Sequence, residues 1–251
     1  MRKLKALFWL HLLRTRRYLV SILSGSFTDA LWMAIFLFGA FSSRDILYAK
    51  EAYWALVAWA IIANAGWMIG GWIDYLSELG LLEPLDLAGS PPVTVASARA
   101  FTVLFSVFLS SCMLLLLSFT LGLNPLEVSS PLGLMVSLSL LWIQATAYGS
   151  IIASTVILTT TPGVLLDIAS LLYMGLLLVD FPVDMLSLLS LIPLLGPGYL
   201  ARQSVNSTYG LNFIPQAVTT TALLVILATR YSRYVVEAIK RREGYKSIAF
   251  Q

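Results

Sequence analysis

Long apolar stretches separated by short polar segments recur along the whole chain. About 20 apolar residues suffice for a helix to cross the hydrocarbon core of a membrane, at roughly 1.5 Å per residue. The pattern therefore predicts an all-α integral membrane protein in which residues 1–251 form a single transmembrane domain. The six expected transmembrane helices are Tyr18–Phe41, Tyr53–Ile73, Val95–Leu121, Leu132–Leu158, Val164–Val179 and Phe213–Tyr231.

A further apolar segment, residues 181–202, is interrupted by proline and glycine just before the last of these helices. Pro182, Pro193 and Pro197 each lack a backbone N–H group, so a continuous spanning helix is disfavoured. Irregular backbone at membrane depth must be covered by protein or line a water-filled cavity. We therefore expect short helices that re-enter the bundle from the extracytoplasmic side.

Composition and charge add an orientation to this pattern. Hydrophobic residues make up 59% of the chain and charged residues 12%, about half of the charged content of an average soluble domain. Basic residues gather before the first helix and after the last one, and positive flanking residues stay in the cytoplasm. We expect a multi-pass protein of the cell membrane with both termini cytoplasmic. This orientation places residues 42–52, 122–131 and 180–212 outside, and residues 74–94 and 159–163 inside.

Residues 1–17 precede the first expected span and combine basic residues with leucine, phenylalanine and tryptophan. They lack a small-residue cleavage site, which argues against a signal peptide. One interpretation is an amphipathic helix that lies in the inner interface of the membrane and contacts lipid headgroups. The alternative is that the basic residues only set the topology.

Motifs for enzymatic chemistry are missing from the sequence. No glycine is followed by lysine, so the chain has no P-loop. His11 is the only histidine and Cys112 the only cysteine, which leaves no catalytic triad and no His or Cys metal site. We expect no catalytic residue, no metal and no cofactor bound by this chain. The net charge of +3 follows from topology and gives no reason to expect nucleic-acid binding.

The expected inner segment 75–90 is acidic and rich in leucine, although inner loops usually favour lysine and arginine. Its leucines give a short amphipathic helix one apolar side, and Gly89 with Pro91 ends it. One interpretation is a surface helix that only caps the bundle. The other is a docking helix for a soluble cytoplasmic partner.

In this segment the sequence resembles the type-2 ABC transporter permeases, the membrane subunits of ATP-driven exporters. The family has an acidic residue, a glycine-containing stretch and a serine-proline pair before the third span, and Glu78, Gly80, Glu83, Ser90 and Pro91 follow that order. Leu81 replaces the family's threonine, and Pro84 lies inside the expected helix.

A second match to the family lies in the stretch LSLIPLLGPGYLARQ. Pro197, Tyr199 and Arg202 resemble the family's asparagine-proline-hydrophobic-tyrosine element and the arginine after it. Gly196 stands in the place of the asparagine.

The resemblance implies a permease that works with a separate ATP-binding subunit and with a second copy of itself or a related permease. ATP and magnesium would bind to the partner subunit, and an inner coupling helix would pass the motion of that subunit to the spans. The residues implied in docking are Glu78, Leu79, Leu82, Glu83, Leu85 and Asp86.

Two acidic residues within apolar stretches are candidates for a transport pathway, because a charge inside a membrane is costly unless it faces a cavity or a partner. Asp29 lies in the first stretch and Asp167 near the start of the fifth. The alternatives are that Asp29 lies in the interface and that Asp167 merely favours a helix N-terminus. Gly66 and Gly70 permit close helix packing, either within the chain or between copies.

A second class of function stays open at this point. The chain could be a self-sufficient secondary carrier or a membrane scaffold without an ATPase partner. A carrier normally shows inverted repeats and paired intramembrane ionisable residues. The sequence shows no clear internal repeat and has only Asp29 and Asp167 for that role.

Overall fold

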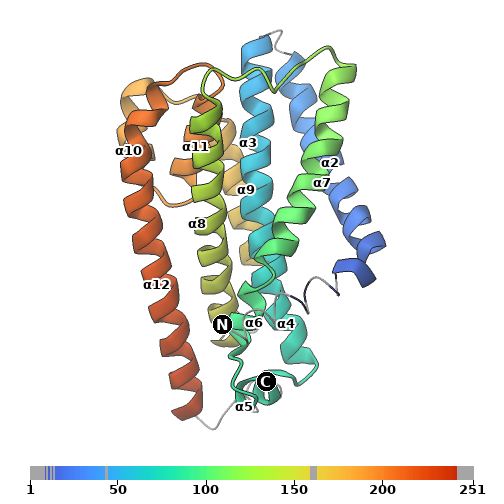
Figure 1. Cartoon of the computed structure of the whole chain (residues 1–251), viewed down its shortest axis with the longest axis vertical. Coiled ribbons are helices and arrows are strands. Elements are labelled where there is room, and N and C mark those ends of the chain that lie inside the picture. The colour runs from blue at the N-terminus through green and yellow to red at the C-terminus, as the bar shows by residue number, and fades with distance from the viewer. Residues whose placement is uncertain are drawn as a thin grey trace.

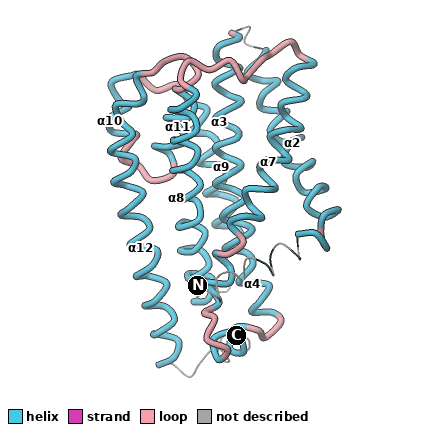
Figure 2. Tube along the Cα trace, in the orientation of Figure 1, coloured by secondary structure: helices cyan, strands magenta, loops and turns pink. Residues whose placement is uncertain are grey.

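The protein is helical throughout the part that the computed structural model describes, residues 9, 11, 13, 15–42, 45–158 and 163–241. Of these residues 84% are in helices and none is in a strand. The long helices lie side by side along the longest axis, and the loops gather at its two ends (Figures 1 and 2). The all-α prediction is confirmed for this part of the chain.

Five helical stretches are long and apolar enough to cross a membrane, which fits a multi-pass membrane protein. They correspond to five of the six predicted spans, and they are Leu19–Ser42, Ile46–Glu78, Pro92–Thr120, Pro131–Leu158 and Gly210–Ala238. The span predicted at Val164–Val179 is helix α9, Gly163–Leu178. Its 16 residues extend about 24 Å, less than the ~30 Å of hydrocarbon in a typical membrane. The count of six therefore stays a prediction.

The first half of the chain supplies the centre of the bundle. One continuous helical stretch consists of α3 (Ile46–Ala65), a π-helical turn (Gly66–Gly70) and α4 (Gly71–Glu78). The other elements of this half are α2 (Leu19–Ser42), α5 (Leu82–Leu87), α6 (Pro92–Ser97), α7 (Ala100–Thr120) and α8 (Pro131–Leu158).

The second half consists of α9 followed by a series of short helices and one long one. These are a 3₁₀ turn (Val183–Met185), α10 (Leu186–Leu189), α11 (Leu195–Gln203), a second 3₁₀ turn (Tyr209–Phe213) and α12 (Ile214–Arg241). We call the end of the bundle with α4, α5 and α6 the α5 end, and the end with α10 and α11 the hairpin end (Figure 1).

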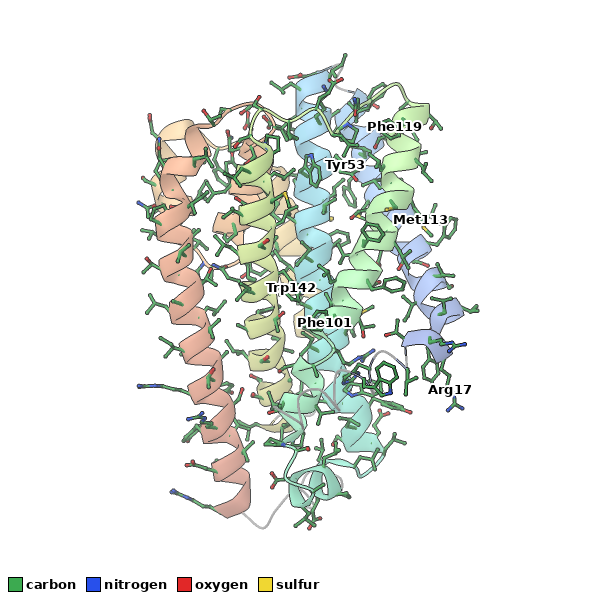
Figure 3. All side chains as sticks on the ribbon, viewed as in Figure 1. Arg17, Tyr53, Phe101, Met113, Phe119 and Trp142 are labelled. Atoms are coloured by element: carbon green, nitrogen blue, oxygen red, sulfur yellow. The ribbon has the colours of Figure 1, made fainter. Side chains whose placement is uncertain are left out.

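The helices differ in how deeply they lie in the bundle. The spans that contain α3 and α8 are 61% and 56% buried, whereas those of α2 and α12 are 22% buried. α2 packs on α7, α12 packs on α8, and α9 packs on α3 (Figure 1). Figure 3 shows Phe101 of α7 and Trp142 of α8 where these two helices meet, with ring centroids 5.8 Å apart. α3 and α8 therefore form the core, and α2 and α12 are the outer helices.

The second helix begins seven residues before the predicted Tyr53, so most of the expected outer loop 42–52 is helical. The Asp45 carboxylate caps it by accepting hydrogen bonds from the backbone N–H groups of Leu47 and Tyr48. The two charged residues of its first turns, Lys50 and Glu51, pair with partners elsewhere in the chain. The hydropathy pattern alone placed these two charged residues outside the helix. Because both are paired, the helix includes them.

Segment 181–202 forms a helical hairpin whose two ends meet. The backbone N–H of Phe181 donates a hydrogen bond of 2.9 Å to the Tyr199 hydroxyl, which lies near the end of α11. All nine residues of α11 are buried. At the tip, Leu194 has a positive φ of 68°, and its N–H donates to the side-chain oxygen of Gln144 on α8. The segment thus leaves and returns at one end of the bundle, and its position relative to a membrane stays a prediction.

Two glycines of the hairpin lie where a side chain has no room. A Cβ atom at Gly196 would lie 2.7 Å from the Ser190 carbonyl oxygen in the opposite leg. A Cβ atom at Gly198 would lie 2.7 Å from Leu177 of α9. Gly196 therefore lets the two legs of the hairpin approach each other closely.

Gly66 and Gly70 lie in the π-helical turn and pack on other helices of the same chain. A Cβ atom at Gly66 would lie 3.2 Å from Leu166 of α9 and 3.5 Å from Tyr148 of α8, and one at Gly70 would lie 3.0 Å from the Cβ of Ile152 of α8. Gly149 of α8 is equally confined, because its Cβ would lie 2.7 Å from the Ala65 carbonyl oxygen. Small residues on both helices thus bring the two backbones together.

Most of the expected N-terminal helix 1–17 lies outside the described residues. The described positions in it are 9, 11, 13 and 15–17, and all are helical. Trp9 is exposed, whereas the His11 ring is buried and its Nε2 lies 3.1 Å from the Val95 carbonyl oxygen. The histidine thus packs on the bundle, and the interfacial position of the segment stays a prediction.

Candidate functional site

The expected docking segment consists of the end of α4, a tight turn and the short helix α5. Gly80 and Gly89 have positive φ angles of 64° and 69° and end α4 and α5 respectively. Beyond each helix a backbone N–H reaches back five residues, from Leu81 to the Leu76 carbonyl and from Ser90 to the Leu85 carbonyl. Pro84 lies in the first turn of α5, where its missing N–H breaks no helical hydrogen bond.

The side chains of this segment divide between the bundle and the surface. Leu82 is only 3% exposed and contributes to the core, so its side chain is not available to a partner. Glu78 and Leu79 are exposed, and Glu83, Leu85 and Asp86 are half-buried. The most exposed leucine of the segment is Leu87, at 81%, which the sequence-based docking set omitted.

A cavity of about 960 Å³ opens between α2, α3, α4, α7 and α9. Its lining includes both acidic residues that the sequence singled out, Asp29 of α2 and Asp167 of α9. Its volume lies within the usual range for small-molecule sites, roughly 300–1,000 Å³. The structure therefore brings to one cavity two acids that are 138 positions apart in the chain.

Asp29 is held on the cavity wall by a neutral partner. The side-chain amide of Asn64 donates a hydrogen bond of 3.0 Å to Asp29 Oδ2 and another of 3.0 Å to the Ala60 carbonyl oxygen. One turn earlier in α2, the Ser26 hydroxyl lies 3.1 Å from the Ser106 hydroxyl of α7. These contacts fix α2 between α3 and α7 at the level of Asp29.

The α9 side of the cavity is held by tryptophan residues of the central helical stretch. The Trp59 indole N–H lies 3.0 Å from both the carbonyl and the hydroxyl oxygen of Ser170. Near the start of α9, the indole of Trp67 lies 3.8 Å from a Cβ built on Gly163. Asp167 lies between Gly163 and Ser170 in α9, so it lies beside residues 59–67 of the central stretch. Asn64, which holds Asp29, is in the same part of that stretch. The two carboxylates thus lie at similar levels of the cavity, one on α2 and one on α9.

Arg99 lies at the α5 end of the same cavity. Its guanidinium stands over the Trp72 ring, 4.2 Å from the ring centroid. The exposed leucines Leu79 and Leu81 also line this end of the cavity. The expected docking segment and the cavity are therefore continuous with each other.

A buried ionic cluster at the hairpin end surrounds Arg202, which is only 1% exposed. Its Nε and Nη2 each lie 3.0 Å from Glu51 Oε2, and Nη2 lies 3.2 Å from Asp180 Oδ1. Nη1 donates to the Leu177 and Val179 carbonyl oxygens at the end of α9. Arg202 thus joins α3, α9 and the hairpin.

The other residues of the second sequence match surround the same cluster. Tyr199 is fully buried, and its ring centroid lies 5.3 Å from the Arg202 guanidinium carbon. Pro197 is buried in the first turns of α11. Beyond the match, the side-chain amide of Asn206 also donates a hydrogen bond to Glu51. The match Pro197, Tyr199 and Arg202 therefore holds the hairpin in place and does not line the cavity.

Sequence reasoning missed the neutral residues that build these sites. Asn64 and Ser170 are common residue types within apolar helices, and only their position in space marks them. Glu51 offered a signal, because it is a carboxylate followed directly by a long apolar stretch.

Comparison with protein-family models gives no match, and comparison with curated proteins gives none either.

Proposed function

We propose that this chain is the membrane-spanning permease subunit of an ATP-driven exporter, which pairs with a separate ATP-binding subunit and a second permease copy. The observation that carries the proposal is the position of α5. A short helix, closed on both sides by glycine, lies beyond the ends of two long apolar helices. Three leucines of this segment are exposed: Leu79 and Leu81, which also line the cavity, and Leu87, which does not. Exposed apolar side chains gathered outside the spans indicate a surface that another protein covers.

The connections of α5 suit a mechanical role. α5 contacts α4 and α6, and both of these pack on α8 in the core. Leu79 and Leu81 line the cavity directly. A partner that pushes α5 would therefore move the wall of the cavity as well as the central helices.

Charge adds to the argument for the partner. Glu78, Glu83 and Asp86 make this segment acidic, and neither Glu78 nor Glu83 forms an ion pair among the described residues. Arg17 lies toward the α5 end (Figure 3), and Arg230 and Arg233 lie in the second half of α12, which ends at the α5 end (Figure 1). Their positions fit a cytoplasmic position for α5. Basic residues around an apolar groove on the ATP-binding subunit would complement this surface.

The test is a single charge placed on the proposed contact. We expect a P-loop ATPase, detected by photolabelling with 8-azido-ATP, to copurify with the wild-type chain but not with Leu87→Arg. The matched control is Leu126→Arg, which changes an exposed leucine in the loop at the hairpin end. Copurification and coupled ATP turnover that survive Leu87→Arg, or a wild-type chain that brings down no ATPase, contradict the proposal.

One observation favours the second candidate, a self-sufficient secondary carrier. Asp29 and Asp167 line the same cavity within one chain, as the paired ionisable residues of such carriers do. The two candidates differ in vesicles that contain only this chain. Uptake driven by an ion gradient without ATP supports the carrier, and its absence there together with ATP-dependent export in the complex supports the permease.

A further inference from the structure

We propose that the cavity between α2, α3, α7 and α9 binds an organic cation with a large apolar body, whose positive centre lies between Asp29 and Asp167. The proposal of a binding site depends only on the cavity. The further idea that the bound cation is the exported cargo rests on the proposed function.

The charge of the cavity argues for a cationic ligand. Within the described residues, neither Asp29 nor Asp167 forms an ion pair. The partner of Asp29 is the Asn64 amide, which supplies one N–H and no charge. A carboxylate in a largely apolar cavity is stabilised most by an opposite charge, so the half-buried Asp29 and the exposed Asp167, which both line this cavity, favour a ligand cation.

The size and lining of the cavity argue for an organic ion. A volume of about 960 Å³ far exceeds an inorganic ion. Within the described residues, no group of three or more His, Cys, Asp or Glu side chains is placed to hold a metal. Trp32, Trp59 and Trp67 line the walls. Indole faces attract organic cations and also cover apolar surface, which is how aromatic cages bind quaternary ammonium groups.

Arg99 carries the only permanent positive charge among the described lining residues, and its position leaves the acids accessible. Arg99 precedes Ser106 by seven residues, which is about 10 Å along α7. Ser106 contacts Ser26, which lies one turn before Asp29 in α2. Arg99 therefore lies farther toward the α5 end than Asp29. Its guanidinium also stands over Trp72. The cavity is therefore polarised, with the positive charge at the α5 end and the negative charges deeper.

The experiment compares two probe ions of the same shape and opposite charge, tetraphenylphosphonium and tetraphenylborate. The purified chain in detergent is titrated with each ion, and quenching of tryptophan fluorescence reports binding. We expect the cation to bind, and Asp29→Asn or Asp167→Asn to weaken its binding about tenfold, because each removes one of the two negative charges that line the cavity. Binding of the anion should stay the same or tighten in these variants.

Two variants make the result specific. Asp29→Glu keeps the charge and should retain cation affinity within a few-fold, which separates lost charge from a damaged fold. Asp184→Asn changes an exposed acid at the hairpin end and should have no effect. Equal binding of both ions, or cation binding that Asp29→Asn and Asp167→Asn leave unchanged, overturns the proposal.

The outcome can be told apart from failure of the proposed function. The titration needs no ATPase, so a chain that binds the cation but never engages an ATPase keeps this inference and loses the permease proposal. A chain that engages an ATPase through α5 but prefers neither ion loses this inference alone.

Discussion

Two pairs of carboxylates lie in or beside the helices of this protein, and they differ in what surrounds them. Glu51 and Asp180 meet at the buried guanidinium of Arg202 at the hairpin end. Asp29 and Asp167 line an open cavity, and the structure shows no ion pair for either of them among the described residues. The first pair contributes to the fold, since both carboxylates form ion pairs with Arg202 of the same chain. The second keeps its charge available to a ligand.

The largest expected effect comes from breaking the satisfied pair. Arg202→Ala leaves Glu51 buried without a counter-charge, and removing one partner of a buried ion pair costs about 3–5 kcal/mol. Thermal unfolding in detergent should show a large loss for Arg202→Ala and a smaller one for Arg202→Ala combined with Glu51→Gln. A double variant as unstable as the single one would show that the pair does not hold the hairpin.

Gln144 of α8 is a buried neutral residue that contacts the tip of the hairpin. Gln144 accepts from the Leu194 N–H and donates to the Thr221 hydroxyl at 2.8 Å. Gln144→Leu keeps a similar volume but leaves these partners unsatisfied, at a cost of about 1–3 kcal/mol. We expect intermediate destabilisation in the same unfolding assay. Ser139→Ala, on the exposed side of the same helix, is the control and should change little.

Removing a cavity acid should affect stability least among the buried groups, and in the opposite direction. Asp29→Asn removes a charge that has no described counter-charge and retains the position of the hydrogen bond with Asn64. Its stability should therefore be unchanged or greater by up to about 1 kcal/mol. A loss as large as that of Arg202→Ala would mean that Asp29 has a structural partner and would weaken the contrast between the two pairs.

The smallest effect is expected for an ion pair on the surface. Lys50 Nζ lies 2.6 Å from Glu127 Oε2, and this hydrogen bond, with the charge of Lys50, holds the pKa of Glu127 below its ordinary 4.5. A depressed folded-state pKa adds stability above pH 4.5, and that stability is lost as the pH falls through the folded value. Wild type and Glu127→Gln should differ slightly at neutral pH and converge in acid. Because Glu127 is fully exposed, salt should reduce the difference.

The apolar pattern was a reliable guide to the helices and a poor guide to their ends. Five of the six predicted spans have long apolar helices as counterparts. The second helix starts earlier than its hydropathy suggests, because Lys50 and Glu51 find partners in the loop 121–130 and in the hairpin. Hydropathy treats a charge as exposed to solvent and cannot include a partner 151 positions away.

The candidate site was predictable in its charged members only. Asp29 and Asp167 stood out because a carboxylate is rare in an apolar stretch. That they share a cavity depends on α2 and α9 both packing against α3, which no local pattern encodes. The docking set shows the same limit, since Leu82 turns into the core and Leu87 outward although both fit the leucine pattern.

Composition and the spacing of apolar residues are enough to show that the chain is helical and apolar enough to fit a membrane, and the sequence shows that it lacks a P-loop. These properties are local. Which carboxylates pair with Arg202 and which face the cavity follows from how the helices pack. The cost of a charge depends on the groups within a few ångströms of it, and in this fold those groups come from helices far apart in the sequence.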